Sequence, residues 1–395
     1  MSKRGYKTRI YPTSGQEQDL ARVFGCVRFI FNQYTAYRAY EYENQVLQRK
    51  THSQLRSILT VSNKKTAFPW LAQAPAAALQ ESCAQAKDAY AAMVKKRAAG
   101  KKARTPRRTR KGVQSFRLPG ANSFKVKVYD AKHGKFKLYI PKVGWVKGKA
   151  GRNVENATSL TISKDSTGKY WASFILEAQH HTATPAQAAS IDLGLTHLAT
   201  ITTTSGQRYK IDTPQFYQKN QRKLTRAQRK FARTKKGSNN RTKAAIAIAK
   251  IHQKIRNQRN DYLHQLTSTI TRENQTVAVE TLNITGLSRT RLGKSINNAA
   301  WAMLVSMLEY KLATAGGRLI KIDRFAPTTQ TCSVCGAPGG KKALNIRVWQ
   351  CQECETWLDR DYNAAVNIML AAGLAESLNA CGEDVRRQLA GAVLV

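Results

Sequence analysis

The sequence predicts a multidomain α+β protein, with an N-terminal β-barrel interrupted by a helical domain, then an α/β domain that contains a cysteine-rich insertion. Three observations predict this class. Apolar residues alternate at a period of two near the start of the chain and again over residues 125–177, but at helical spacing in between. The pattern resets after residue 187, and two Cys-x-x-Cys pairs follow late in the chain. The 395 residues suffice for two or three domains with separate cores.

The chain is strongly basic. It contains 66 Lys and Arg residues against 24 Asp and Glu, which gives a formal net charge of +42. Such an excess implies a polyanionic partner, usually nucleic acid. The basic residues are spread along the whole chain, which disfavours a membrane surface, and no apolar run approaches the roughly 18 residues of a membrane span. With no secretory signal and an odd number of cysteines, seven, we expect a reducing cytoplasmic location and no membrane partner.

The N-terminal part contains a strand, a helical block and a basic arm. Residues 6–11 alternate as a strand that ends at Pro12, and residues 15–96 have apolar residues three and four apart, which predicts helices. Ten of the 17 residues from Lys95 to Lys111 are cationic and none is acidic. This arm is expected to become ordered only on a polyanion.

Two β-hairpins are predicted at residues 125–140 and 159–177, and with the first strand they suggest a small β-barrel into which the helical block is inserted. In the first hairpin four lysines occupy one face and apolar residues the other; they are Lys125, Lys127, Lys135 and Lys137. Residues 178–188 have the composition of a linker. His180 and His181 within it are therefore interpreted as solvated side chains rather than as metal ligands.

Beyond the linker the pattern is that of an α/β domain. Residues 188–211 predict three consecutive strands, and the elements after them are predicted helices at about 214–235 and 241–272, a strand at 276–282, a helix at 299–317, a strand at 318–322 and a final helix. Between Thr213 and Asn260 there are 15 basic residues and no acid. Five of them recur at three- and four-residue intervals on the first helix: Lys219, Arg222, Arg226, Arg229 and Arg233. A solvated face usually mixes both signs, so this stripe favours phosphate binding.

Four cysteines predict a metal site. Cys332 and Cys335 form one Cys-x-x-Cys pair, and Cys351 and Cys354 form a second pair 15 residues further on. This spacing is typical of a zinc ribbon, in which four thiolates bind Zn²⁺ tetrahedrally. Because four cysteines fill the coordination sphere, we expect one structural zinc rather than a catalytic one; four free buried thiols at this spacing are the disfavoured alternative. The isolated Cys26, Cys83 and Cys381 are interpreted as small core residues.

Three acids lie in apolar settings. Asp192 is in the predicted strand SIDLGL, Glu280 ends the apolar run TVAV, and Asp361 opens the final helix. Each has an ordinary interpretation when taken alone: a turn-capping aspartate, a solvent-facing strand end, and an N-cap for which Asp359 competes. If Asp359 caps the helix, the small residues that follow would let the helix approach the sheet, with Asp361 against the strand of Asp192.

The order of the three acids indicates an RNase H-like core, where carboxylates from a first strand, a later strand and a terminal helix converge. Three carboxylates with no cationic partner would repel one another. Mg²⁺ resolves this conflict because it prefers carboxylate, water and phosphate oxygens. Two such ions about 4 Å apart can activate a water molecule and stabilise the leaving oxygen of a phosphodiester.

Several segments resemble those of one known family. They are YKTRIYPTSGQEQDLARVFGCVRFIFN, IPKVGW, SIDLGL, AVETLNITGL, QTCSVCG, WQCQECETWLDRDYNAAVNI and LNACGE. Over nearly its whole length the chain resembles TnpB, the RNA-guided nuclease family of IS200/IS605- and IS607-type insertion sequences, which is related to Cas12. The resemblance implies that Asp192, Glu280 and Asp361 form the RuvC triad that binds two Mg²⁺ ions, with Asp361 rather than Asp359 matching the Asp-x-Asn-Ala-Ala signature. It assigns the family's zinc finger to the four clustered cysteines.

The resemblance also implies a domain order and partners. The domains expected are a wedge β-barrel at 1–13 and 119–183, an inserted helical recognition domain at 14–118, a RuvC domain at 184–327 and 357–395, and an inserted zinc ribbon at 328–356. The partners are an ωRNA guide, with one protein per RNA, and double-stranded target DNA. Such a protein reads a short transposon-adjacent motif, opens an R-loop and cleaves both strands at one site. Gln80 and Asn122 are candidates to read the motif, although exposed amides are usually just solvated.

Four alternatives stay open at this point. A nuclease-inactive RNA-guided repressor would lose one or more of the acids, whereas all three are present. A compact Cas12 effector that uses a CRISPR RNA is not separated from TnpB by the protein sequence. A non-catalytic zinc-ribbon RNA-binding protein would leave the three acids unexplained. A DDE transposase shares the core fold, but its third acid is commonly Glu, and the cysteine insertion beside Asp361 does not fit it.

Overall fold

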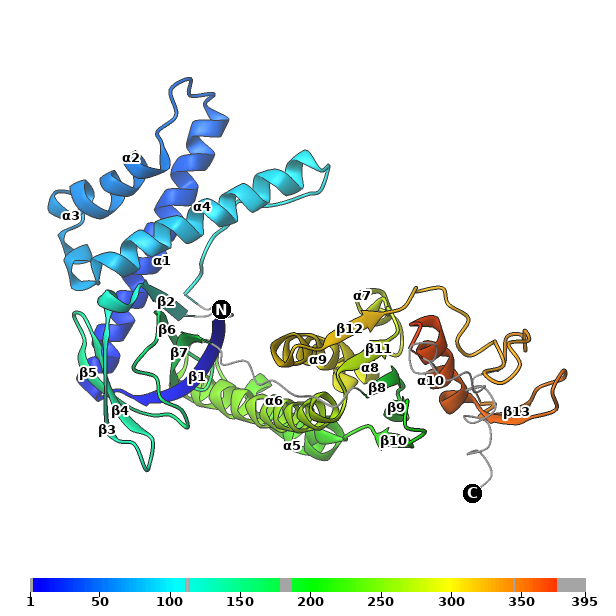
Figure 1. The fold of residues 1–395 in the computed structure, drawn as a ribbon. Helices are drawn as coiled ribbons and strands as arrows, with labels where there is room; N and C mark the ends of the chain where they lie inside the picture. The colour runs from blue at the N-terminus through cyan, green and yellow to red at the C-terminus, as the bar shows by residue number, and fades with distance from the viewer. Residues whose placement is uncertain (1–2, 111, 113, 178–186, 344, 375–395) are drawn as a thin grey trace. The chain divides into compact units, whose positions relative to one another are not determined.

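The computed structural model describes residues 3–110, 112, 114–177, 187–343 and 345–374. Its chain contacts divide into two compact units, Met1–Ala178 and Gln179–Val395. Each unit combines a β-sheet with α-helices, so the predicted multidomain α+β class is confirmed (Figure 1). His180, His181 and Cys381 lie outside the described residues, as does the LNACGE segment.

The first unit is built on a seven-stranded antiparallel sheet. Its strands are β1 (Lys3–Tyr11), β2 (Gln114–Pro119), β3 (Lys125–Asp130), β4 (Lys135–Ile140), β5 (Gly144–Lys149), β6 (Ser159–Lys164) and β7 (Tyr170–Glu177), in the order β2-β6-β7-β1-β5-β4-β3. Both predicted hairpins are present, as β3–β4 and β6–β7. Among the described residues the backbone pairings leave β2 and β3 as edges, so closure into a barrel stays a prediction.

A helical block lies between β1 and β2 in the chain, as predicted. Its elements are α1 (Ser14–Glu43), α2 (His52–Ser57), η1 (Ile58–Ser62), α3 (Asn63–Lys65), η2 (Pro69–Gln73) and α4 (Ala76–Ala98), and a short turn η3 (Ala121–Ser123) follows β2. Thr13 and Gln16 form a capping box that begins α1 at the end of the first strand. Phe24 and Leu79 from the helices share one hydrophobic core with Ile10 and Phe136 from the sheet.

The structure differs from the sequence prediction just after the basic arm. Residues 114–118 were expected in the helical domain, but they form most of β2, where Phe116 and Leu118 are buried. Arg108 in the arm is half-buried: its backbone N–H donates to Asn32 Oδ1 at 2.8 Å, and its guanidinium lies 4.2 Å from the Phe31 ring centroid. Arg108 therefore contacts α1 through both its backbone and its side chain.

The second unit contains a five-stranded mixed sheet. Its strands are β8 (Ala188–Asp192), β9 (His197–Thr203), β10 (Arg208–Asp212), β11 (Thr276–Val279) and β12 (Arg318–Lys321), in the order β10-β9-β8-β11-β12. The first three strands form the predicted antiparallel meander. Strand β11 runs parallel to both β8 and β12. The carboxyl ends of β8 and β11 therefore lie at the same edge of the sheet.

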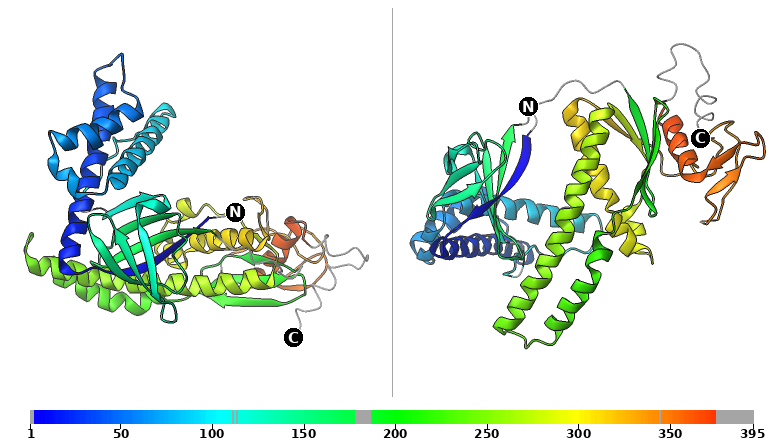
Figure 2. Two further views of the ribbon diagram at one scale, coloured as in Figure 1. Left: turned by 60° about the vertical axis from the view of Figure 1, so that its left-hand side comes forward. Right: turned by 90° about the horizontal axis from the view of Figure 1, so that it is seen from below.

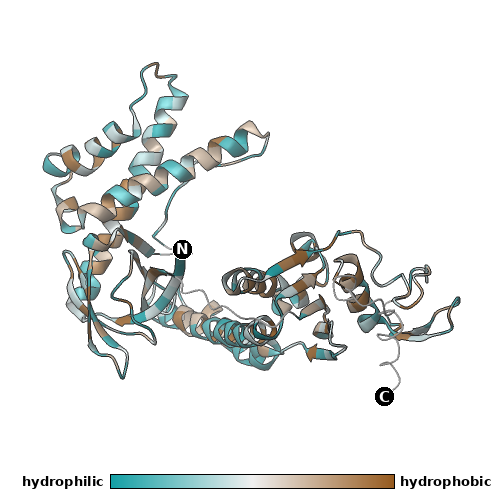
Figure 3. Cartoon of the chain, viewed as in Figure 1, coloured by the Kyte–Doolittle hydropathy of each residue, from teal (hydrophilic) through white to brown (hydrophobic). Residues whose placement is uncertain are grey.

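Helices cover both faces of this sheet. They are α5 (Phe216–Ala232), α6 (Asn239–Glu273), α7 (Ile284–Leu287), α8 (Gly293–Ala299), α9 (Trp301–Ala315) and α10 (Arg360–Ala371). Ile191 and Val277 pack in one core with α6 and α9, whereas Ala188 and Ala278 pack in another with Ile368 of α10. Because successive strand residues face opposite sides, α10 covers the face opposite α6 and α9 (Figure 2). Figure 3 shows the contrast between the apolar α9 and the hydrophilic α5.

Between β12 and α10 the chain forms a small cysteine-rich segment. It contains one antiparallel hairpin, β13 (Val348–Gln350) paired with β14 (Trp357–Asp359), and an isolated bridge between Thr331 and Pro338. Strand β14 leads directly into α10. The cysteine-rich segment is therefore joined to the first turn of that helix without a loop.

Candidate active site and metal centre

Asp192 is the last residue of β8, and Glu280 directly follows the neighbouring parallel strand β11. Ile191 on β8 pairs with Val279 on β11, so the next residue of each strand, Asp192 and Glu280, lies at the same level. Alternation along the strands places both acids on the sheet face that packs against α10, as it does Ser190, whose hydroxyl donates to the Ala365 carbonyl of α10 at 2.6 Å. Two carboxylates thus occupy one end of the sheet beside this helix.

The first turn of α10 brings the third acid to the same region. Asp359 is the N-cap, and its Oδ1 accepts from the backbone N–H groups of Asp361 and Tyr362 at 3.0 Å each. Ala364 and Ala365 are fully buried, and α10 packs against β8. The expectation that Asp359 caps the helix and that small residues allow its close approach is confirmed.

The three acids share one electrostatic environment. Burial raises the pKa of Asp192 to about 8, and the negative charges of Glu280 and Asp361 add to that rise, whereas Arg360 opposes it. In this structure the carboxylate oxygens of the three acids are not close enough together to hold a metal ion as one group. Among the described residues, four cysteines form the only group of three or more His, Cys, Asp or Glu side chains close enough to hold a metal ion.

Asp361 has cationic partners, contrary to the expectation that the acids would have none. Lys210 Nζ lies 3.6 Å from Asp361 Oδ2, and Arg347 Nη1 lies 3.3 Å from its Oδ1. Lys210 also pairs with Asp359 at 2.7 Å. Lys210 comes from β10 and Arg347 from the cysteine-rich segment, so the fold supplies cations in addition to Arg360, which lies between the two aspartates in the sequence.

Glu280 is fixed by a hydrogen bond instead. The Thr328 hydroxyl donates to its Oε1 at 2.6 Å. Two asparagines of α10 hold the same segment in place: Asn363 Nδ2 donates to the Thr331 carbonyl at 2.8 Å, and Asn367 Nδ2 donates to the Thr328 carbonyl at 2.8 Å. Sequence reasoning missed these polar residues, although buried amides in a small-residue helix are a usable signal.

The four cysteines converge as predicted. Their sulfur atoms all lie within 4.8 Å of one another, with Cys332 and Cys354 at 3.7 Å and Cys335 and Cys351 at 3.6 Å. Zn–S bonds of about 2.3 Å in a tetrahedron place sulfur atoms about 3.8 Å apart. The group therefore fits a metal ion such as zinc.

The thiols of the cysteine group differ in pKa. The nearby Thr356 hydroxyl lowers the pKa of Cys354 to about 6, whereas burial raises the pKa of Cys332 to about 12. Cys26 and Cys83 lie apart in the core of the first unit, where burial raises the pKa of Cys83 to about 12. Both match the interpretation as core residues.

The predicted cationic stripe is exposed. Lys219, Arg222, Arg226, Arg229 and Arg233 all have exposed side chains on or at the end of α5. Leu224 on the other face of α5 is buried. Within the described part of the chain, no ion pair involves any of the five, so their charges face solvent uncompensated.

A second basic surface lies on the sheet of the first unit. Lys127 on β3, Lys137 on β4 and Lys147 on β5 stand directly opposite one another in register, and all three are exposed. Lysines in such a row repel one another. Sequence analysis placed the β3 and β4 lysines on one face but missed the row, because Lys147 joins it only through strand pairing. Exposed aromatic side chains flank this lysine row at Tyr11 and Trp145.

Gln80 on α4 and Asn122 in η3 are exposed, so their proposed role stays a prediction.

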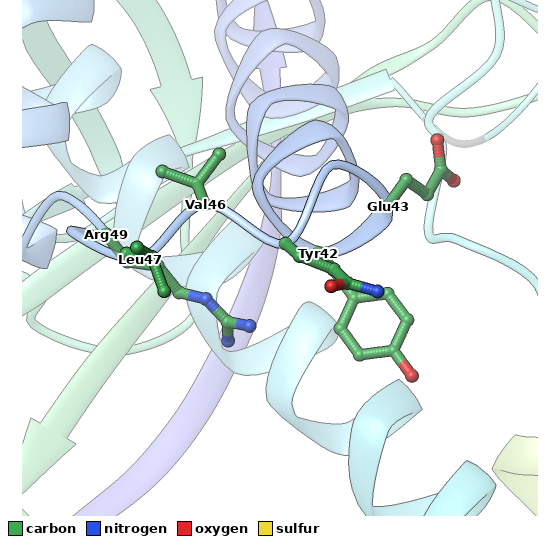
Figure 4. A pocket seen from close by; sticks show the side chains of 6 residues that line it. Tyr42, Glu43, Val46, Leu47 and Arg49 are labelled. Atoms are coloured by element: carbon green, nitrogen blue, oxygen red, sulfur yellow. The ribbon is translucent and has the colours of Figure 1, made fainter.

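A surface hollow at the end of α1 is lined by Tyr42, Glu43, Gln45, Val46, Leu47 and Arg49 (Figure 4). It shares no residue with the acids or the cysteines, and Leu47 on it is 100% exposed. None of the described helices is sufficiently long and apolar to cross a bilayer.

Family models match three parts of the chain. The OrfB_IS605 family, described as "Probable transposase", matches residues 172–291, and the Cas12f1-like TNB domain matches residues 301–368. A model described as "Helix-turn-helix domain" matches residues 1–45. In this structure that last stretch consists of β1 and the single long helix α1.

Whole-length similarity identifies the family. A Streptomyces pristinaespiralis protein named "Putative RNA-guided DNA endonuclease" is 34% identical over 98% of this chain and 92% of its own length. This chain belongs to the TnpB family. An Escherichia coli K12 protein of similar name is 29% identical to this TnpB protein, over 96% of this chain and 94% of its own length. The Cas12f1 endodeoxyribonuclease of Sulfoacidibacillus thermotolerans is 29% identical over 36% of this TnpB chain and 34% of its own.

Solved structures support the fold of this TnpB protein. A chain of a Cas12f1–sgRNA–target DNA complex aligns over 93% of this chain and 98% of its own, with a TM-score of 0.60 and 14% identity. The RNA-guided endonuclease Cas_phi3 aligns over 95% of this chain and 93% of its own, with a TM-score of 0.56 and 10% identity. At these identities the likeness establishes a Cas12-like fold.

Proposed function

We propose that this protein is an RNA-guided DNA endonuclease that cleaves both strands of a target at one RuvC-type site formed by Asp192, Glu280 and Asp361. One observation carries the site assignment: Asp192 and Glu280 lie level at the ends of two neighbouring parallel strands, and burial, together with the negative charges of Glu280 and Asp361, raises the pKa of Asp192 to about 8. The strand order, with β11 parallel to β8, supports an RNase H-like core. The presence of all three acids favours cleavage over a nuclease-inactive role.

The acids suit divalent metal. Asp192 is buried beside two further negative charges, which a shared cation would neutralise, and hard oxygen ligands fit Mg²⁺. Asp192, Glu280 and Asp361 would hold two Mg²⁺ ions. When bound, these would supply a metal-activated water and stabilise the leaving oxygen of the phosphodiester. The chain's own residues orient the ligands: Thr328 holds Glu280, and Asp359 fixes the first turn of α10.

A guide RNA and double-stranded DNA are the proposed partners. Relatives carry the name RNA-guided DNA endonuclease, and one solved neighbour is a complex with sgRNA and target DNA. The α5 stripe and the lysine row would bind phosphates, since their exposed charges have no ion-pair partner among the described residues. Base pairing with the guide would supply most sequence specificity, while Gln80 and Asn122 would read a short target-adjacent motif.

The cysteine-rich segment would bind one structural Zn²⁺ through its four thiolates as a zinc ribbon inserted in the RuvC domain. The first sheet would close as the wedge barrel around the inserted helical recognition domain. The proposal also includes the domain bounds expected from the sequence, except for residues 114–118. It includes a cytoplasmic location as well.

Co-purified RNA would first be sequenced to define the guide, and cleavage of matched plasmid DNA in Mg²⁺ would then test the site. Asp192→Ala should abolish cleavage and keep RNA-guided DNA binding, because it removes a metal ligand without touching the basic surfaces. Asp212→Ala is the control, since Asp212 is on the same sheet but 89% exposed. Undiminished cutting by Asp192→Ala would refute the site.

A nucleic-acid binding assay tests the α5 stripe separately. Replacing Arg222 and Arg226 together with Glu should weaken guide RNA binding and reduce its salt dependence, because each lost phosphate contact removes about one unit from the salt slope. The control is Arg272→Glu on α6, where the arginine already pairs with Glu273 at 3.6 Å. Unchanged RNA affinity in the double variant would contradict the role of the stripe.

A further inference from the structure

We propose that Lys210 is a positioning residue that holds the first turn of α10, and with it Asp361, at the metal-binding end of the sheet. This inference rests on the proposed function. Lys210 lies on β10, the edge strand, and its side chain is only 21% exposed. No motif used to identify the acids includes it.

One ammonium group contacts three residues at the start of α10. Lys210 Nζ lies 2.7 Å from Asp359 Oδ2 and 3.6 Å from Asp361 Oδ2, and 4.8 Å from the Tyr362 ring centroid. The aspartates come from a segment 149 residues further along the chain. The contacts therefore tie an edge strand to the helix terminus across the face of the sheet.

Asp359 transmits this contact to Asp361. Its Oδ1 accepts from the backbone N–H of Asp361 at 3.0 Å, while its Oδ2 accepts from Lys210. With both oxygens engaged, the carboxylate plane cannot rotate freely, and the Asp361 backbone is held by it. Residues that orient metal ligands in this way tune affinity although they do not bind the metal.

Neither Arg347 nor Lys321 duplicates this role. Arg347, the second partner of Asp361, is 54% exposed and makes no ion pair with Asp359. The pair between Lys321 on β12 and Glu309 on α9 is 3.0 Å long but 42% and 57% exposed, and such surface pairs contribute little. Lys321 therefore offers a matched control on the same sheet.

The test compares Lys210→Met, Lys210→Arg and Lys321→Met as guide RNA complexes with target DNA. We expect Lys210→Met to weaken Mn²⁺ binding, titrated by electron paramagnetic resonance, about 10- to 100-fold, as for other residues that orient metal ligands. Its single-turnover cleavage should need correspondingly more Mg²⁺, while its affinity for target DNA stays unchanged. Lys210→Arg should restore most of the metal affinity, and Lys321→Met should match the wild type.

Wild-type Mn²⁺ affinity and Mg²⁺ dependence in Lys210→Met would overturn the proposal, and so would an equal defect in Lys321→Met. If Lys210→Met does not fold, Lys210→Gln is measured in its place by the same criteria. Asp192→Ala, assayed in parallel, separates the two hypotheses. Cutting by Asp192→Ala defeats the proposed function itself, whereas an inactive Asp192→Ala beside a normal Lys210→Met defeats only the role of Lys210.

Discussion

The hydroxyl of Thr328 donates a 2.6 Å hydrogen bond to Oε1 of Glu280. Thr328 is 6% exposed and lies where the chain leaves the sheet for the cysteine-rich segment. Its carbonyl oxygen accepts from Asn367 of α10 at 2.8 Å. One threonine therefore links the acid of β11 to the helix that carries Asp361, so the acids are joined by neutral hydrogen bonds as well as by charge.

Removing this hydroxyl should impair the proposed cleavage. Thr328→Val keeps the shape of the side chain but frees Glu280 Oε1, so we expect single-turnover cleavage to slow about 10- to 100-fold, as for other groups that orient metal ligands. RNA-guided DNA binding should be unchanged. Thr328→Ser retains the donor and should recover most of the rate. Equal rates for the valine and serine variants would show that the hydrogen bond has no such role.

Stability should depend on pH through Asp192. An aspartate in the unfolded chain titrates near pH 4, whereas in the fold its pKa is raised to about 8. Between these values the folded state binds more protons than the unfolded state, so stability without divalent metal should fall as the pH rises from about 4 to about 8. Asp192→Asn removes this penalty and should melt at a higher temperature than the wild type near pH 8, but not near pH 4.

Thermal unfolding in magnesium-free buffer across this pH range measures the effect. Adding Mg²⁺ at pH 8 should raise the melting temperature of the wild type more than that of Asp192→Asn, because the variant lacks one proposed ligand. A difference in melting temperature between the two proteins that is the same at every pH would contradict the titration of Asp192.

Loss of the cysteine group should loosen α10. Cys351→Ser removes one of four ligands, so zinc content should fall, and the segment held by Asn363 and Asn367 should lose its fixed position. Zinc analysis with amide hydrogen exchange over residues 360–371 measures both effects. The control is Cys83→Ala, which lies in the core of the first unit and should leave zinc bound. Full zinc content in Cys351→Ser would exclude the four-thiolate site.

Periodicity and spacing predicted most of the helices and strands and the group of four cysteines, because those signals are local. Strands β8 and β11 are continuous apolar runs because both of their faces are buried, and the Cys-x-x-Cys pairs form turns of their own. The partners of these residues were not predictable in this way. Lys210 reaches Asp359 across 149 residues, and Arg108 meets Asn32 across 76, through packing that no local pattern encodes. Strand β2 was missed because a basic arm precedes it.

The lysine row gives a prediction in which stability and binding change in opposite directions. Lys137 stands between Lys127 and Lys147 with like charges on both sides. Lys137→Glu would replace two repulsive cross-strand pairs with two attractive ones, each worth roughly 0.2–1 kcal/mol. The melting temperature of the free protein should therefore rise. If guide RNA lies on this face, the same variant should bind it more weakly and with a smaller salt slope.

The control is Lys132→Glu, which makes the same charge change on an exposed turn residue of the same hairpin, outside the row. It should change RNA affinity less and leave the melting temperature close to that of the wild type. A Lys137→Glu protein that is more stable yet binds guide RNA as tightly as the wild type would exclude this face as an RNA surface. The repulsion between the three lysines in register would then destabilise the fold, since no phosphate would offset it.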